Sequence, residues 1–197
     1  MRASQGELVQ PGLTRSIWQN KWVKIAIQAL LLVVFSATTA FMKRIHPSIG
    51  IPSSSAPFWL TAMIVARCTM DWPGSGTLVG VGTAVWGIPI RLEQTFGQNL
   101  ASFGIAGLVL DVMMLIPKMD IRKWWGAILC ALVANLAQFG VILYSSLTAT
   151  VVKHFEVVGI LNSLGLHVAF GIAAGLMGWA IYRGGETTCR KIGRHNL

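Results

Sequence analysis

Charge is scarce in this sequence, and negative charge above all. Charged residues make up 12% of the 197 positions, and only 7 of them are Asp or Glu against 16 Lys or Arg. Disordered chains combine low hydrophobicity with high charge, so disorder is excluded. With 54% hydrophobic residues and a mean hydropathy of +0.62, the chain also differs from ordinary soluble domains. We therefore expect it to lie in a lipid bilayer.

The sequence also has few cysteines and lacks the common catalytic motifs. Cys68, Cys130 and Cys189 are an odd number without close spacing, which indicates neither a disulfide framework nor a metal knuckle. No G-x-x-x-x-G-K-[ST] loop and no H-E-x-x-H motif occurs, and the four histidines share no ligand spacing. We expect no ATPase of the phosphate-loop class, no metal site and no cofactor.

Long charge-free runs are what the sequence does contain. Six such runs cover residues 25–42, 45–66, 72–90, 94–110, 124–152 and 157–182. A helix needs roughly 17 to 25 apolar residues to cross a bilayer. We predict one helix for each run, at residues 25–42, 57–70, 76–90, 99–116, 124–147 and 157–182. The predicted fold class is an all-α integral membrane protein, a bundle of six transmembrane helices.

The basic residues support this count and orient the bundle. Under six crossings, 12 of the 16 Lys and Arg residues fall on one side of the membrane and 4 on the other. Cytoplasmic loops carry the excess of Lys and Arg, so both termini are predicted to be cytoplasmic. We divide the chain into a cytoplasmic N-terminal segment at 1–23, a six-helix membrane domain at 24–183 and a basic cytoplasmic tail at 184–197. The expected location is the cell membrane, as a multi-pass protein.

Small residues four positions apart recur inside the predicted helices, where they allow helix backbones to approach closely. The pairs are Ser36 and Ala40, Gly76 and Gly80, Ala127 and Ala131, Gly171 and Gly175, and Ala174 and Gly178. One interpretation is packing within the bundle. The other is that one such face docks a partner protein.

Polar residues inside the predicted helices are concentrated in the outer half of the membrane. Each costs free energy in hydrocarbon and is expected to face the bundle interior or a cavity. By depth the group comprises Asn99, Asn135, Gln138, Asn162, Ser163 and His167, and the outer loop adds Arg91, Glu93, Gln94 and Gln98. Trp59 and Trp86 lie near this group and are expected either to stack on a planar ligand or to serve in packing. The group is predicted either to bind a ligand or to join helices by hydrogen bonds.

Charged residues mark the cytoplasmic end of the second predicted helix. Arg67 and Asp71 are four residues apart, a spacing suited to an ion pair. Asp111 lies well inside a predicted span, and we expect it to pair structurally with a base such as Arg67. A coupling surface or a proton path is the alternative role for Asp111.

An intramembrane serine protease is the enzyme hypothesis that the sequence offers. Ser75, between Gly74 and Gly76, would be the nucleophile and His167 the base, which resembles the rhomboid pattern superficially. Pro73 stands where that pattern has Gly, two places before the serine. The topology also separates Ser75 from His167 by on the order of 10 to 15 Å, at ~1.5 Å per helical residue. We therefore expect the chain not to be an enzyme.

Over roughly residues 22 to 185 the chain resembles the substrate-binding S component of an energy-coupling factor (ECF) transporter. The likeness rests on size, on the six spans, and on the stretches Phe58-Trp59-Leu60 with Ile64-Val65-Ala66-Arg67, Trp72-Pro73-Gly74-Ser75-Gly76-Thr77-Leu78-Val79-Gly80, and Ile105-Ala106-Gly107-Leu108-Val109-Leu110-Asp111. It implies capture of one small vitamin-like molecule near the outer face. The molecule is then delivered through a membrane-embedded coupling subunit and two cytoplasmic ATPase subunits. Substrate contacts implied by the resemblance are Asn99, Gln138, Asn162, His167, Arg91, Glu93 and Gln94.

Partner docking is the second point on which the resemblance bears. Many S components dock through an A-x-x-x-A pattern in the first helix, and Ser36-x-x-x-Ala40 stands in its place here. Docking through Ser36 and Ala40 is one expectation, and a dedicated ATPase module is the other. The alternative function is a membrane scaffold without a small-molecule ligand, which ligand-dependent stabilisation would separate from a transporter subunit.

Overall fold

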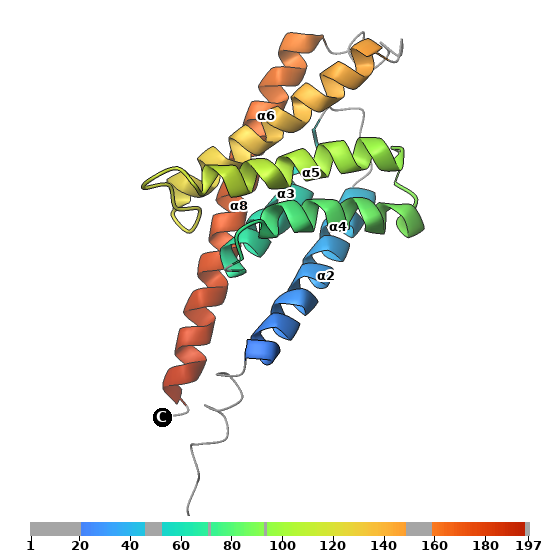
Figure 1. The fold of residues 1–197 in the computed structure, drawn as a ribbon. Helices are drawn as coiled ribbons and strands as arrows, with labels where there is room; N and C mark the ends of the chain where they lie inside the picture. The colour runs from blue at the N-terminus through green and yellow to red at the C-terminus, as the bar shows by residue number, and fades with distance from the viewer. Residues whose placement is uncertain (1–20, 46–52, 71, 93, 149–158, 196–197) are drawn as a thin grey trace, which may run out of the picture.

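The computed structural model describes residues 21–45, 53–70, 72–92, 94–148 and 159–195. These residues form helices and the turns between them, without a strand, which confirms the predicted all-α fold (Figure 1). The helices are α2 (Lys21–Ile45), α3 (Ala56–Thr69), α4 (Ser75–Ile90), α5 (Phe96–Met113), α6 (Trp124–Thr148) and α8 (Ile160–His195). Each of the predicted helical ranges overlaps one of them.

Four of these helices are long and apolar enough to cross a bilayer: Lys21–Ile45, Phe96–Met113, Trp124–Ser146 and Ile160–Cys189. The apolar helix α4 has 16 residues, and α3 has 14. Both are shorter than the roughly 17 residues that a perpendicular crossing requires. The helical and apolar character expected of a membrane protein is therefore present, with four spans that meet the length criterion.

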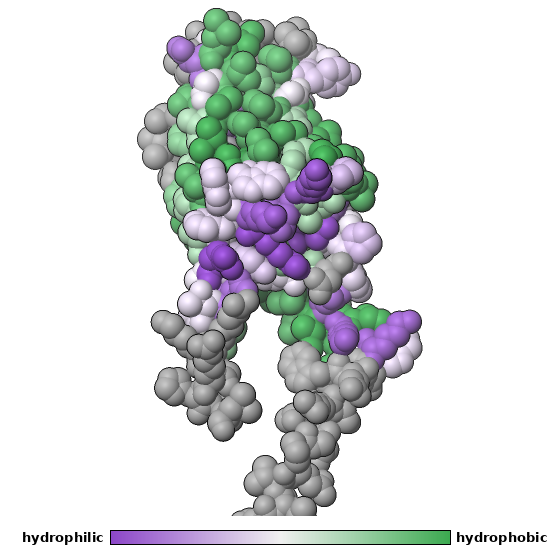
Figure 2. Space-filling view, turned by 90° about the vertical axis from the view of Figure 1, so that its left-hand side faces the viewer, coloured by the Kyte–Doolittle hydropathy of each residue, from purple (hydrophilic) through white to green (hydrophobic). Residues whose placement is uncertain are grey.

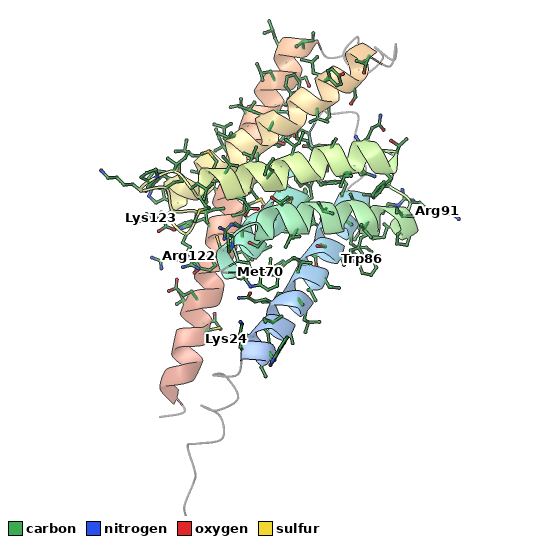
Figure 3. The ribbon with its side chains drawn as sticks, in the orientation of Figure 1. Lys24, Met70, Trp86, Arg91, Arg122 and Lys123 are labelled. Atoms are coloured by element: carbon green, nitrogen blue, oxygen red, sulfur yellow. The ribbon has the colours of Figure 1, made fainter. Side chains whose placement is uncertain are left out.

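The helices α4 and α5 lie side by side, run in opposite directions and cross the middle of the molecule, whereas α2 and α8 run steeply across this view (Figure 1). The lower and left-hand side of the view holds the start of α2 and the end of α8 at the bottom, and the connection between α5 and α6 at the left. Arg122 and Lys123 lie there, whereas Arg91 lies at the far end of α4 (Figure 3). We name these the basic end and the opposite end. Figure 2 views the basic end, where hydrophilic residues gather below an apolar surface.

The short helix α3 lies in the middle of the bundle. It packs against α2, α4, α5, α6 and α8, and 9 of its 14 residues are buried. The large side chains of Trp59, Leu60, Met63 and Ile64 are among the most buried in the chain. Because most residues of α3 pack against protein, few of them have to face lipid.

Glycines bring α4 and α5 into backbone contact. A Cβ added at Gly107 would overlap the carbonyl of Gly76, and one added at Gly80 would overlap the carbonyl of Phe103. On α8, a Cβ at Gly175 would lie 2.6 Å from the Cα of Ile128 in α6. These glycines therefore pack helices within the chain, which is the first of the two interpretations that the sequence allowed.

Two of the helix boundaries that differ from the prediction have a visible cause. The helix predicted from Asn99 begins three residues earlier, because Thr95 and Gln98 form a capping box across the first turn of α5. Helix α8 continues past Tyr182 to His195, through the segment predicted as a basic tail. An ion pair between Arg183 and Glu186, 3.0 Å long and three residues apart, supports this extension.

Candidate functional site

Asn135 joins three parts of the chain at a buried position in α6. Its Nδ2 amide donates to the carbonyl oxygen of His167 in α8 at 2.6 Å, and to the Ser53 hydroxyl in the turn before α3 at 3.2 Å. Asn135 is fully buried. Ser53 has a positive φ of 63°, a conformation that L residues rarely adopt outside special turns. The turn is thus fixed to α6 and α8 through one amide group.

His167 lies next to this amide and is also buried. Its Nδ1 lies 2.8 Å from the carbonyl oxygen of Ser163, one turn earlier in α8. A carbonyl oxygen only accepts, so this contact places the proton on Nδ1. The ring packs at a tilt against Phe139, with 4.8 Å between the ring centroids.

Gln138 is one turn from Asn135 on the same side of α6 and is only 6% exposed. It forms no hydrogen bond with any residue that the structure describes. The Gln138 amide is not among the fully buried polar atoms that lack a partner in the described part of the chain. The amide is therefore a candidate for contact with water or a small molecule.

Lys43 and Ser55 extend the group toward α2 and α3. The Lys43 ammonium donates to the Ser55 hydroxyl at 2.8 Å. Ser55 is the N-cap residue of α3, yet its side chain forms no capping hydrogen bond. Lys43, Ser53, Ser55, Asn135, Gln138, Ser163 and His167 are named here the polar cluster. Sequence reasoning missed Lys43, Ser53 and Ser55, although the signal was present: a serine run directly precedes α3, and a lysine lies in the last turn of α2.

Other predicted site residues belong to the turn between α4 and α5. The Asn99 side chain is buried and its Nδ2 donates to the carbonyl of Gln94 at 3.1 Å. Arg91 caps the end of α4 with a positive φ of 57° and an exposed side chain. No hydrogen bond among the described residues joins this turn to the polar cluster, and Glu93 lies outside the described residues. Asn99 therefore holds the turn in shape.

Two further predicted residues lie away from the polar cluster. Asn162 is exposed in the first turn of α8, next to the buried Ser163. Trp59 is buried in the core, where its ring meets the Phe103 ring edge-on with 5.2 Å between centroids. Asn162 thus lies on the exposed side of α8, and Trp59 lies in the core of the bundle.

The basic end contains the other network of buried polar groups. Arg67 Nε lies 2.9 Å from Asp111 Oδ1, which is the structural pair that the sequence suggested. The Asp111 carboxylate also accepts from the backbone of Gly76 at 3.1 Å and from the backbone and hydroxyl of Thr77, both at 2.7 Å. It therefore caps the N-terminal end of α4 from the neighbouring helix, where a negative charge is favoured. Asp71, the other predicted partner of Arg67, lies outside the described residues.

Ser75 and His167 are in different networks. Ser75 is the first residue of α4, at the basic end, and its buried hydroxyl has no hydrogen-bond partner among the described residues. His167 belongs to the polar cluster, where Nδ1 contacts Ser163. No hydrogen bond in the described part of the chain joins the two side chains, so a Ser–His pair is not formed in this structure.

Ser36 and Ala40, the predicted docking residues, are buried against the rest of the bundle. The Ser36 hydroxyl donates to the carbonyl of Val79 in α4 at 3.3 Å. A Cβ added at Gly82 would overlap the Ser36 side chain. In this conformation α4 occupies the face of α2 that carries the S-x-x-x-A pattern.

Comparisons with known proteins give no match: no family model fits the chain, and no curated protein or solved structure is significantly similar to it. The functional argument therefore depends on the geometry of the chain itself.

Proposed function

We propose that this chain is the substrate-binding membrane subunit of an ECF-type uptake transporter. It captures a small vitamin-like molecule at the outer face of the cell membrane. A membrane-embedded coupling subunit and two cytoplasmic ATPase subunits then complete transport. The chain itself performs no enzymatic step.

The polar cluster is the observation that carries this proposal. Burying polar groups in a membrane protein costs free energy. Such groups are therefore rare inside the membrane and are concentrated at functional sites. Here Asn135 joins His167 to the turn before α3 through hydrogen bonds, and Gln138 lies one turn further along α6. Gln138 has no protein partner among the described residues. A ligand that enters from the outer face would satisfy it.

The placement of the first and last described helices favours six crossings with both termini in the cytoplasm. The start of α2 and the end of α8 both lie at the bottom of Figure 1, and Arg122 and Lys123 lie on the left-hand side of the molecule in Figure 3. Helix α8 has 36 residues, a length of about 54 Å against a hydrocarbon core of about 30 Å. Its C-terminal part, from Arg183 on, therefore extends beyond the bilayer on the basic side. In this proposal α3 and α4 cross within the bundle, where α3 is shielded from lipid.

Docking of the coupling subunit through Ser36 and Ala40 requires α2 to separate from α4, because both residues are buried. A partner that binds this face would therefore compete with the contact between Ser36 and Val79. Docking would therefore change the packing of α2 on α4, whereas ligand capture would use the polar cluster.

A thermal-shift screen of the purified full chain against vitamins and their precursors tests the proposal. A ligand that binds only the folded protein stabilises it by RT ln(1 + [L]/Kd), about 2.7 kcal/mol at a hundredfold excess over Kd. At least one compound is expected to raise the melting temperature in a saturable way. A membrane scaffold would respond to none of them.

A further inference from the structure

We propose that the connection between α5 and α6 binds the head groups of anionic phospholipids at the membrane surface. The connection comprises residues 114–123, between the end of α5 at Met113 and the start of α6 at Trp124. The inference goes beyond the proposed function and does not depend on it, because the polar cluster takes no part. It follows from the charge of the connection, from its exposed apolar side chains and from its fixed shape.

Positive charge dominates the connection. Residues 114–123 contain three basic residues, Lys118, Arg122 and Lys123, against one acidic residue, Asp120. All three basic side chains are exposed, and Lys123 lies on the left-hand side of the molecule (Figure 3). Neither Lys118 nor Lys123 forms an ion pair with a residue that the structure describes. The connection therefore presents a net positive charge, which attracts an anionic membrane surface.

Apolar side chains flank these charges at both ends. Leu115 is 78% exposed, Ile116 is 45% exposed, and Trp124 is 56% exposed. Tryptophan is enriched at the boundary between head groups and hydrocarbon, where lysine also places its apolar stem in lipid and its ammonium among the head groups. Figure 2 views this side of the molecule, and hydrophilic residues gather there below an apolar surface (Figure 2). The combination is typical of a segment at the interface between lipid and water.

Hydrogen bonds and packing fix the shape of the connection. Ile121 is buried, and its carbonyl oxygen lies 3.7 Å from the Cys68 sulfur at the end of α3. Arg122 Nε donates to the Cys68 carbonyl at 3.3 Å, and the Arg122 backbone N–H donates to the Asp120 carboxylate at 3.0 Å. A Cβ added at Gly126 would overlap the carbonyl of Asp120. The connection is thus held in place before a lipid binds, which lowers the entropy cost of binding.

An anionic phospholipid matches both kinds of exposed side chain. Its phosphate carries the charge that Lys118 and Lys123 attract, and its acyl chains contact Leu115, Ile116 and Trp124. A free phosphate would use only the charges. A phospholipid without net charge would use mainly the apolar side chains, and an acidic protein segment would leave them in water. We therefore assign this surface to phospholipids of net negative charge, such as phosphatidylglycerol.

Titration with short-chain lipids tests the proposal on the purified full chain in a neutral detergent. The probes are dioctanoyl phosphatidylglycerol, dioctanoyl phosphatidylcholine and glycerol 3-phosphate. Thermal shift and native mass spectrometry measure binding. Phosphatidylglycerol is expected to bind roughly tenfold more tightly than phosphatidylcholine, and this preference should shrink as the salt concentration rises. Equal affinity for the two lipids, a response to neither of them, or equal stabilisation by glycerol 3-phosphate would overturn the proposal.

Variants identify the residues responsible. Lys118→Gln and Lys123→Gln are each expected to weaken phosphatidylglycerol binding roughly fivefold, and the double variant roughly tenfold or more, close to the level of phosphatidylcholine. Lys123→Arg keeps the charge and is expected to retain most of the affinity. Arg44→Gln, at an exposed position near the end of α2, is the matched control and should leave the affinity unchanged.

Melting temperatures without lipid show whether each variant is folded. An unchanged affinity in the folded double variant would overturn the assignment to the connection. An equal loss in Arg44→Gln and Lys123→Gln would reduce the effect to general surface charge and would overturn the assignment as well.

Discussion

Asn135 and Gln138 are similar side chains one helical turn apart, yet their surroundings differ. The Asn135 amide is occupied by the His167 carbonyl and the Ser53 hydroxyl, so it joins parts of the protein. The Gln138 amide forms no hydrogen bond among the described residues. The first residue therefore contributes to stability, and the second is the one that binds a ligand in the proposed function.

Replacing each of the two by alanine separates these roles. Asn135→Ala strands the Ser53 hydroxyl, and we expect it to lower the free energy of unfolding by about 1 to 3 kcal/mol. Gln138→Ala breaks no described hydrogen bond, so its effect on stability is expected to stay within about 1 kcal/mol while ligand affinity falls roughly tenfold. Thermal unfolding and ligand titration on both variants measure this. Equal destabilisation by the two variants would show that Gln138 also joins helices.

The ion pair of Arg67 and Asp111 gives a second prediction at this scale. Asp111→Asn keeps the size of the side chain but leaves the half-buried Arg67 without its counter-charge, and we expect a loss of roughly 3 kcal/mol or more in stability. Glu186→Gln is the contrasting control, because its pair with Arg183 is exposed and such pairs contribute about 1 kcal/mol or less. Denaturant titration of both variants makes the comparison, and similar losses would contradict a structural role of Asp111.

At the scale of helices, the sequence predicted which segments are helical better than it predicted where each helix begins and ends. Apolar runs predict helices because a bilayer leaves few other ways to satisfy the backbone. Boundaries depend on a few side chains, such as the Thr95 and Gln98 capping box that moves the start of α5 away from Asn99. The end predicted at Tyr182 followed from the loss of apolar character, but helix α8 continues through residues that are polar and still form helical hydrogen bonds.

The contact between α4 and α5 predicts that two glycines on the same helix differ in their tolerance to alanine. Gly107→Ala places a methyl group against the backbone of Gly76, which has no flexible side chain to move aside. We expect a loss of about 3 kcal/mol or more, at or above the upper part of the range for overpacking. Gly104→Ala meets no atom within 4 Å and should be neutral or slightly stabilising. Thermal unfolding of the two variants provides the test, and a neutral Gly107→Ala would mean that the helices are further apart.

On the scale of the whole molecule, the sequence was informative about how deep each polar residue lies along its helix. Counting residues from the ends placed Asn135 and His167 at similar depth, and the structure brings them into contact at 2.6 Å. Depth does not fix which face of a helix is buried, and for that reason it missed that Asn162 is exposed while Ser163 is buried. Lys43 was counted only as a basic residue of the outer side, since sequence alone does not show that its side chain turns back to Ser55.

Topology is the prediction that belongs to the entire chain. Since 12 of the 16 basic residues fall on one side under six crossings, reporter tags at residue 1 and residue 197 are both expected to be cytoplasmic. Fusions to a phosphatase that is active outside the cell and to a fluorescent protein that folds inside it read out the two positions. Tags on opposite sides would require an odd number of crossings.

The enclosed position of α3 has a consequence for biogenesis. This helix has 14 residues, and it packs on α8, which is made last. Thr61 donates to the carbonyl of Ala174 at 3.1 Å across 113 residues of chain. During synthesis α3 is therefore without one of its main neighbours until α8 emerges from the ribosome. Nascent chains that end before Gly159 should expose α3 to membrane quality-control proteases and turn over faster than the full chain in a pulse-chase experiment, and supplying α8 as a separate segment should restore their lifetime.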